Sequence, residues 1–389
     1  MSAELNDDSY RFSSGGPFNQ VLSRIGLGAS GLEGIKKRMG VIVLLTYFPL
    51  LVLSTIQGFA YNPNIKLPFL FDVTEAVRFI FVGPLLIFSE AFIEQWLDLG
   101  VKYMRKRLVD DIEREKFESF VASARRWRDS YLIEIIFLFC LVPLQLMDMQ
   151  NNMPVQSSSW RFLSADAHAS YAWFWFAFFA RPLIRFLVLR LLWRYVIWSL
   201  FLCRISGLDL KVIPTHPDRH GGLTFIASCH EKFSLIAFIF GLQVASTIAE
   251  KIIFEGRSLL SFQFEVLGVI MVVYLTFLTP LLAFTGKLLQ AKRRGLFEYG
   301  ILADEYSTAF HNKWVDAKGR EESILGTSDI QSLADMSNSY QIVNEMRLCL
   351  INKSTLLTFI IASLLPFAPL ILSVYPFDVL VHQVLKVVM

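Results

Sequence analysis

The sequence predicts an all-α fold: a polytopic transmembrane helix bundle of about seven spans. The 389 residues are 54% hydrophobic and only 18% charged, whereas a soluble domain of this length is about one quarter charged. Several apolar stretches reach the roughly 20 residues that a helix needs to cross the hydrocarbon core of a bilayer. Lys and Arg gather in alternate connections between these stretches, as they do in multi-pass membrane proteins.

The predicted spans follow from the apolar stretches in chain order. They are 39–60, 73–98, 131–147, 169–203, 233–250, 262–286 and 354–374. The third span is close to the minimum length of about 17 residues. The fourth is longer than a bilayer requires, so it tilts strongly, breaks near Pro182 or projects past the membrane.

The basic residues predict the orientation of the chain. Lys36–Arg38 directly precedes the first span, and the insertions 99–130 and 287–353 are rich in Lys and Arg. Because cytoplasmic loops carry this excess, we predict that the N-terminal segment 1–38 is cytoplasmic and that the C-terminus is external. The tail 375–389 alternates polar and apolar residues, which predicts an interfacial helix.

The basic insertions in the transmembrane domain 39–374 are predicted to be helical. In 329–347, apolar residues recur every three or four positions and form one face of an amphipathic helix. Thr327–Asp329 opens this helix as an N-cap cluster. We expect the helix to dock against the inner ends of the bundle, and a partner-binding helix is the alternative.

Two short matches indicate an internal repeat. Ser54–Ile56 in the first span recurs as Ser246–Ile248 in the fifth, and Pro84–Leu86 in the second recurs as Pro280–Leu282 in the sixth. With the fourth span as an additional helix, the plan becomes a three-plus-one-plus-three parallel repeat, an arrangement found in transporters. Chance is the alternative, since short apolar words recur readily in a chain rich in Leu and Phe.

Charged residues inside the predicted spans are candidate functional residues, because ionisable groups are costly in lipid. They are Glu90, Glu94, Glu134, Arg181 and Arg185. At about 1.5 Å per residue, Glu90 and Arg185 reach a similar depth, which predicts carboxylate–arginine pairing with Glu90 or Glu134 as the partner. Such a network either only fixes the packing or lines an aqueous path for an anion or a proton.

The densest polar motif lies in the connection between the fourth and fifth spans. Its residues are His216, Asp218, Arg219, His220, Gly221 and Gly222, and His230 follows in the next helix. Free backbone N–H groups at the start of that helix, beside a basic side chain, are typical of an anion or phosphate site. The histidines and the aspartate are alternatively a set of metal ligands. A rigid turn, in which Asp218 caps the helix and pairs with Arg219, is the third interpretation, and it is the one we favour.

The motif PTHPDRHGGL at 214–223, the arginine-bearing helix before it and GTSDIQSLADMSNSYQIVNEMR at 326–347 carry a resemblance. They resemble an uncharacterised family of bacterial multi-pass inner-membrane proteins, over roughly residues 170–389. The resemblance implies a bacterial inner membrane. It implies no activity, cofactor or catalytic residue.

Three functions follow from these observations. The first is a transporter or channel for a small anionic solute, and the second is an enzyme that acts on a lipid or lipid-linked phosphate at the cytoplasmic face, with His220 as its acid–base group. The third is a membrane scaffold or signalling protein that uses helix 329–347. The net charge of +3 is too small to indicate a nucleic-acid partner. The lipid bilayer is the expected partner, the cofactor is unknown, and a homo-oligomer is compatible with the sequence.

Overall fold

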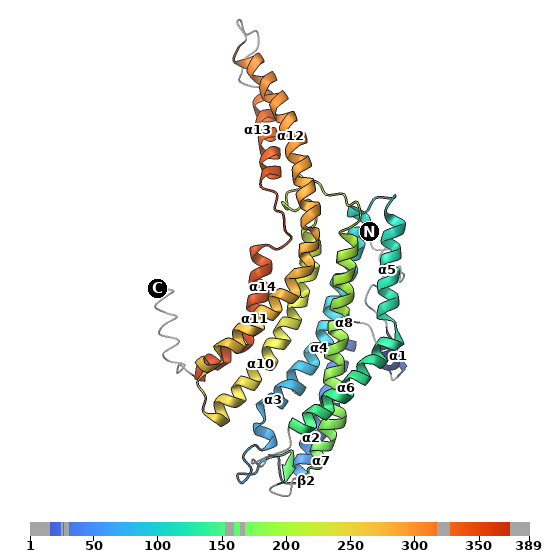
Figure 1. Cartoon of the computed structure of the whole chain (residues 1–389), viewed down its shortest axis with the longest axis vertical. Helices are drawn as coiled ribbons and strands as arrows, with labels where there is room; N and C mark the ends of the chain where they lie inside the picture. Colours follow the sequence, from blue (N-terminus) through green and yellow to red (C-terminus); the bar gives the residue numbers. More distant parts are fainter. Residues whose placement is uncertain are drawn as a thin grey trace.

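Long helices run side by side between two ends of the molecule (Figure 1). The computed structural model describes residues 16–24, 26, 31–151, 159–163, 168–316 and 327–373. Within these residues, six helical segments are long and apolar enough to cross a membrane: Leu32–Ile56, Val73–Leu108, Tyr171–Ile205, Thr224–Glu255, Leu259–Leu282 and Lys353–Ile371. The pair Arg114–Arg128 and Tyr131–Met147, bent by 42°, makes a seventh if it is one span. The predicted all-α polytopic bundle is therefore confirmed.

The first half of the chain forms three of these six segments, the bent pair and their connections. Its helices are α1 (Pro17–Arg24), α2 (Leu32–Ile56), α3 (Val73–Ala76), α4 (Gly83–Tyr103), α5 (Arg114–Arg128), α6 (Tyr131–Asn151), α7 (Tyr171–Trp175) and α8 (Arg181–Ile205). The π-helical turns η3 (Val77–Val82), η4 (Met104–Leu108) and η5 (Phe176–Ala180) link α3 to α4, extend α4 and link α7 to α8. A 3₁₀ turn η2 (Phe69–Phe71) and a two-stranded antiparallel ladder, β1 (Phe162–Leu163) with β2 (His168–Ala169), complete this half.

The second half of the chain supplies the remaining spans and a hairpin. Its helices are α9 (Thr224–His230), α10 (Ser234–Glu255), α11 (Gln263–Leu278), α12 (Thr285–Trp314), α13 (Asp329–Asn344) and α14 (Lys353–Leu364). The 3₁₀ segments η6 (Glu231–Phe233), η7 (Leu259–Phe262), η8 (Thr279–Phe284) and η9 (Leu365–Ser373) link or extend them. We call the end that carries α5, residues 206–223 and the start of α12 the basic end, and the opposite end, with the β1–β2 ladder, the far end (Figure 1).

Apolar side chains face outward on several helices. Phe48 on α2, Phe139 on α6 and Leu275 on α11 are exposed, whereas Phe79 and Trp198 are buried between helices. A large exposed apolar surface is unfavourable in water and is normal where a helix faces lipid. The distribution of apolar residues thus agrees with a bundle that is surrounded by a bilayer.

The helices extend beyond the predicted spans. α2 begins at Leu32, so the basic residues Lys36–Arg38 belong to its first turns rather than to a segment ahead of the helix. The second span continues to Leu108, and the sixth passes through η8 into α12, which ends at Trp314. The apolar stretch marks the part suited to lipid, but charged residues such as Lys, Arg and Glu are good helix formers and continue the backbone ladder. The predicted interfacial tail 375–389 lies outside the described residues.

Three prolines inside the spans coincide with changes of helix type. Pro182 follows the π-helical turn η5, and the helix Tyr171–Ile205 continues through it without a break. At about 1.5 Å per residue this helix is about 50 Å long, so it exceeds the roughly 30 Å of a bilayer core. Pro84 follows η3, and Pro280 opens η8. The internal repeat that pairs these last two prolines stays a prediction.

The predicted amphipathic helix 329–347 is present as α13, but its packing differs from the expectation. α13 lies antiparallel to α12, and the two helices project beyond the basic end as a hairpin (Figure 1). The indole Nε1 of Trp314 donates to Oδ2 of Asp329 at 3.0 Å, so this carboxylate joins the two helices instead of capping α13. In its last turn, Val343 is buried against Gly295 of α12, and Glu345, directly after α13, lies 2.9 Å from Arg219 in the connection 206–223.

Candidate functional site

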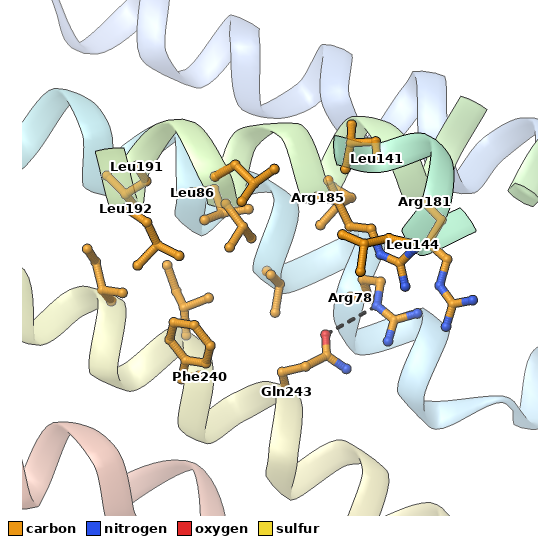
Figure 2. Close-up of a pocket in the computed structure, with 16 residues that line it drawn as sticks. Arg78, Leu86, Leu141, Leu144, Arg181, Arg185, Leu191, Leu192, Phe240 and Gln243 are labelled. Carbon is orange, nitrogen blue, oxygen red and sulfur yellow. Dashed lines mark hydrogen bonds between the residues drawn. The ribbon is translucent and has the colours of Figure 1, made fainter. Parts of the chain in front are cut away.

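A cavity of about 300 Å³ lies among the spans, between η3–α4, α6, α8 and α10. Arg78, Arg181, Arg185 and Gln243 are its polar lining residues. Figure 2 shows the three guanidinium groups at one end of the cavity, and Leu191, Leu192 and Phe240 at the other. We call it the arginine cavity. The sequence predicted Arg181 and Arg185 as intramembrane polar residues, and the structure adds Arg78 and Gln243 to them.

A buried ion cluster at the far end fixes Arg78. The Nη1 of Arg78 lies 2.6 Å from Oε2 of Glu75, and its Nε donates to Oε1 of Gln243 at 3.2 Å. The Nη2 of Arg161 bridges Asp72 at 2.8 Å and Glu75 at 3.1 Å. We call Asp72, Glu75, Arg78 and Arg161 the far cluster. Because both carboxylates are buried, only such pairing allows them to remain charged.

Neighbouring residues hold the Asp72 side chain where it can pair with Arg161. One carboxylate oxygen of Asp72 accepts the N–H of Glu75 at 2.9 Å and caps α3. The other oxygen accepts from Nε1 of Trp160 at 2.9 Å, and so ties α3 to the connection that follows α6. Burial lowers the pKa of the Arg161 guanidinium, but the charges of Asp72 and Glu75 outweigh this and raise that pKa above its usual value. Arg161 therefore stays charged and holds the cluster together.

The cavity has more positive than negative groups around it. Arg181 and Arg185 are one turn apart on α8 and face the same side, and the guanidinium of Arg181 lies 5.0 Å from the ring centre of Phe176. Glu250 is a third carboxylate within electrostatic reach of Arg161. Together with the far cluster, this gives four arginines against three carboxylates.

A second network lies on the opposite face of α8, nearer the basic end. Oε1 of Glu90 accepts from Arg190 at 2.6 Å and lies 2.6 Å from Nη2 of Arg194. Glu94 is 3.8 Å from Arg194. We call these four residues the closed network. The predicted pairing of Glu90 with an arginine is therefore confirmed, but the partners are Arg190 and Arg194 rather than Arg185.

The difference in partner has a geometric reason. Side chains of a helix point back toward its N-terminus, and an arginine side chain is long. An arginine on α8 therefore meets a carboxylate that lies closer to the helix start than its own Cα. The prediction compared only the depths of the Cα atoms in the membrane and therefore paired Glu90 with Arg185. In the structure, the side chain of Arg190 reaches Glu90 instead.

Glu134 lies within electrostatic reach of Arg190 and Arg194, and it also holds a backbone group. Its Oε2 accepts the backbone N–H of Phe18 at 3.1 Å, in the first turn of α1. Phe18 in turn lies under Arg190, with the guanidinium 4.7 Å from the ring centre. Glu134 thus secures the N-terminus of α1 beside the closed network.

The loop around Asp218 is a rigid turn. Oδ1 of Asp218 accepts the N–H groups of His220 at 2.8 Å and Gly222 at 3.1 Å, and Oδ2 accepts that of Thr224 at 3.2 Å. Burial raises the pKa of Asp218, but these backbone hydrogen bonds outweigh it and hold the pKa below its usual range. A Cβ at Gly221, whose φ is +65°, would collide with Val212. The interpretation as a capping turn is confirmed.

The backbone N–H groups that an anion would need in this loop are already used. The N–H groups of Gly222 and Thr224 already donate to Asp218, which occupies the position that an external anion would take. Arg219 does not pair with Asp218 as predicted, because its guanidinium reaches Glu345 after α13 at 2.9 Å.

In the described part of the chain, no three His, Cys, Asp or Glu side chains are placed together to hold an ion. His216 lies 2.8 Å from Asp218, and Nδ1 of His220 contacts the carbonyl of Asp218. His230 is buried away from them. Its Nε2 lies 2.6 Å from the carbonyl oxygen of Phe277. The histidines therefore serve separate local contacts.

His230 and Tyr195 compensate for Pro280. Proline has no N–H, and the change to a 3₁₀ turn at η8 leaves carbonyls of α11 without helical partners. The hydroxyl of Tyr195 donates to the carbonyl of Thr276, and His230 reaches that of Phe277. This arrangement satisfies backbone groups inside the membrane region, as an interrupted spanning helix requires.

Sequence reasoning missed Arg78, Glu75 and Gln243, although each lies inside a predicted span. The rule that ionisable residues within spans are functional candidates applied equally to Arg78 and Glu75, and would have found them. Asp72 and Arg161 fall in connections, where charge carries no such signal.

The fold and the cavity together define a multi-pass membrane protein with a charged cavity among its spans. Comparison with family models, with curated proteins and with solved structures finds no match to this chain.

Proposed function

We propose that this protein binds an anion in the arginine cavity and carries it across the membrane. The observation that supports this function is the convergence of Arg78, Arg181 and Arg185 on one cavity among the spans (Figure 2). Arginine is costly in a bilayer and occurs there where it pairs, faces a cavity or marks a substrate path. A negatively charged solute is the natural complement of three guanidinium groups.

The test is transport by the purified protein in proteoliposomes. Vesicles are loaded with radiolabelled acetate, phosphate or palmitate, and exchange is followed after each anion is added outside. We expect protein-dependent exchange of at least one of these anions, and its loss in Arg185→Gln. Arg257→Gln, which changes an exposed arginine at the far end, serves as the control. Absence of exchange for every anion, from protein that elutes as a single folded species, would refute the proposal.

A second candidate function is a scaffold, which the α12–α13 hairpin favours. Phe297, Ile301 and Leu302 are exposed along α12, beyond the bundle. A cross-linking experiment with a photoreactive residue at Phe297 tests it. A specific protein cross-linked in cells would support the scaffold function. Cross-links to lipid only, or no cross-links at all, would exclude that function.

We further propose that the basic end faces the cytoplasm of a bacterial inner membrane, with the N-terminus inside and the C-terminus outside. The Lys and Arg residues at the basic end support this orientation, and the family resemblance of 214–223 and 326–347 supports the bacterial membrane. Alkaline phosphatase fused after Gly256 is expected to be active, and fused after Trp314 to be inactive. The opposite pattern would reverse the orientation.

A further inference from the structure

We infer that the anion in the arginine cavity is amphipathic, with an acidic headgroup at the three arginines and an acyl chain along α8 toward α11. This inference rests on the proposed anion-binding function and names its substrate class. It follows from the shape and chemistry of the space beyond the arginines.

The arginine cavity is polar at one end only. From Arg181 to Leu192, the α8 residues that line it extend over about 16 Å along the helix axis, at about 1.5 Å per residue. After Arg185 the walls are apolar, with Leu86, Leu191 and Phe240 among them (Figure 2). A small hydrophilic anion has no favourable contact in that part, whereas an acyl chain has.

The apolar end continues into a second cavity. This space of about 340 Å³ lies between α8, α10 and α11 and shares Leu192 and Phe240 with the arginine cavity. Its other lining residues include Gly268, Val272 and Val273 on α11. The two spaces are adjacent, and we treat them as one crevice that has arginines at one end and mostly apolar walls over the remainder.

The crevice opens at the side of the bundle. Leu144 and Phe240, which line the arginine cavity, are 44% and 41% exposed, and Val272, which lines the second cavity, is 63% exposed. These residues lie within spans that lipid surrounds. A molecule can therefore reach the arginines from the bilayer, with its chain remaining among apolar groups throughout.

Among the α8 residues that line the arginine cavity, none between Arg185 and the basic end is charged. The next arginines on that helix, Arg190 and Arg194, are buried and engage Glu90 on another face. A hydrated anion would thus leave its polar contacts halfway through the bundle. An anion that keeps its chain in the crevice does not face that barrier.

An acidic headgroup on an acyl chain has two sources: a free fatty acid or an anionic membrane phospholipid. Both present one negative charge that guanidinium groups recognise, and both carry a chain that fits the apolar part. The experiment below therefore contains one arm for each source.

The experiment measures binding of radiolabelled palmitate to the full-length protein in phosphatidylcholine nanodiscs. Acetate, inorganic phosphate and uncharged monopalmitoylglycerol are the competitors. We expect palmitate to bind, and these three to compete at least about ten-fold more weakly, because each lacks either the chain or the charge. Nanodiscs that contain phosphatidylglycerol separate the sources, since this lipid suppresses palmitate binding only if it occupies the same crevice.

Two variants test the two ends of the crevice. Arg185→Gln is expected to weaken palmitate binding by about ten-fold or more, through loss of a charged hydrogen-bonding partner. Gly268→Leu fills the second cavity, and a Cβ at Gly268 meets no atom within 4 Å, so this variant is expected to fold and to bind palmitate more weakly. Gly286→Leu, also at an open helical glycine but outside both cavities, is the matched control.

The outcomes separate the inference from the function on which it rests. If acetate or phosphate competes as strongly as palmitate and Gly268→Leu has no effect, anion binding stands and the amphipathic substrate is wrong. If the protein binds none of these anions, or Arg185→Gln changes nothing, the proposed function fails together with the inference.

Discussion

The far cluster and the closed network each combine two carboxylates with two arginines, and they differ in what lies beside them. In the closed network, a single carboxylate oxygen of Glu90 contacts both Arg190 and Arg194. The hollow that these arginines line with Glu134 is about 10 Å³, which is room for about one water. The far cluster adjoins a cavity of about 300 Å³, into which Arg181 and Arg185 extend the positive charge.

This difference shows that a charge inside a membrane bundle is not by itself a functional signal. The two arginines nearer the basic end are paired with Glu90 and enclosed, and Phe18 covers Arg190, so their role is to hold α4 and α8 together. The arginines at the cavity face a space that is large enough for a ligand. Their role is therefore tested by binding, and that of the closed network by stability.

The largest expected effect is in the closed network. Glu90→Leu removes the carboxylate that bridges Arg190 and Arg194 and leaves two adjacent buried cations. We expect a loss of about 3–5 kcal/mol in the free energy of unfolding. Thermal unfolding in detergent, followed by size-exclusion chromatography, measures it. Glu94→Leu is the control, because Glu94 is 3.8 Å from Arg194 and should matter less. Wild-type stability of Glu90→Leu would break the comparison.

The next effect concerns the uncharged hydrogen bonds that His230 and Tyr195 make to backbone carbonyls of α11. His230→Phe leaves the carbonyl of Phe277 without its partner, at an expected cost of about 1–3 kcal/mol. Tyr195→Phe does the same for the carbonyl of Thr276. Adding Pro280→Ala restores an N–H to the helix, so we expect Tyr195→Phe to cost less in that background. Equal costs in both backgrounds, in a double-mutant cycle, would contradict the assigned role of Tyr195.

A smaller effect is expected at Asp218, a charge at the bundle's edge that three backbone N–H groups and the side chain of His216 satisfy. Asp218→Asn should cost about 1–2 kcal/mol at neutral pH, because both carboxylate oxygens accept backbone N–H groups and the amide NH2 that replaces one of them cannot accept. Because the folded-state pKa of Asp218 is lowered, its stabilisation is complete above about pH 3.9, the ordinary Asp value, and is lost as the pH falls through the folded pKa. The stability difference between wild type and Asp218→Asn should therefore shrink on acidification. A difference that persists would assign the effect to shape rather than charge.

The smallest effect on stability is expected at the cavity itself. Arg181→Gln keeps a long polar side chain at the cavity and removes the charge that stacks on Phe176, so we expect a smaller loss in the free energy of unfolding than in Glu90→Leu. Palmitate binding in nanodiscs should nevertheless fall. A large loss of stability, comparable to that of Glu90→Leu, would show that Arg181 is held in the fold as firmly as the arginines of the closed network.

The sequence by itself determined the spans, the helical insertions and the turn at Asp218, because each depends on interactions between near neighbours in the chain. Apolar runs of sufficient length specify helices in lipid, and the residues from His216 to Thr224 complete the hydrogen bonds of Asp218 within one loop. Apolar periodicity likewise located α13, although not the helix on which it packs.

Only the tertiary structure decided which charges pair and which face a cavity. Arg161 meets Asp72 from 89 residues away, and Arg190 meets Glu90 from 100 residues away, through tilt, π-helical turns and the reach of long side chains. Such partners depend on the relative placement of whole helices, which no local pattern records. The arginine cavity is in addition a gap in the packing of four elements, so it cannot be predicted from residue spacing along the chain.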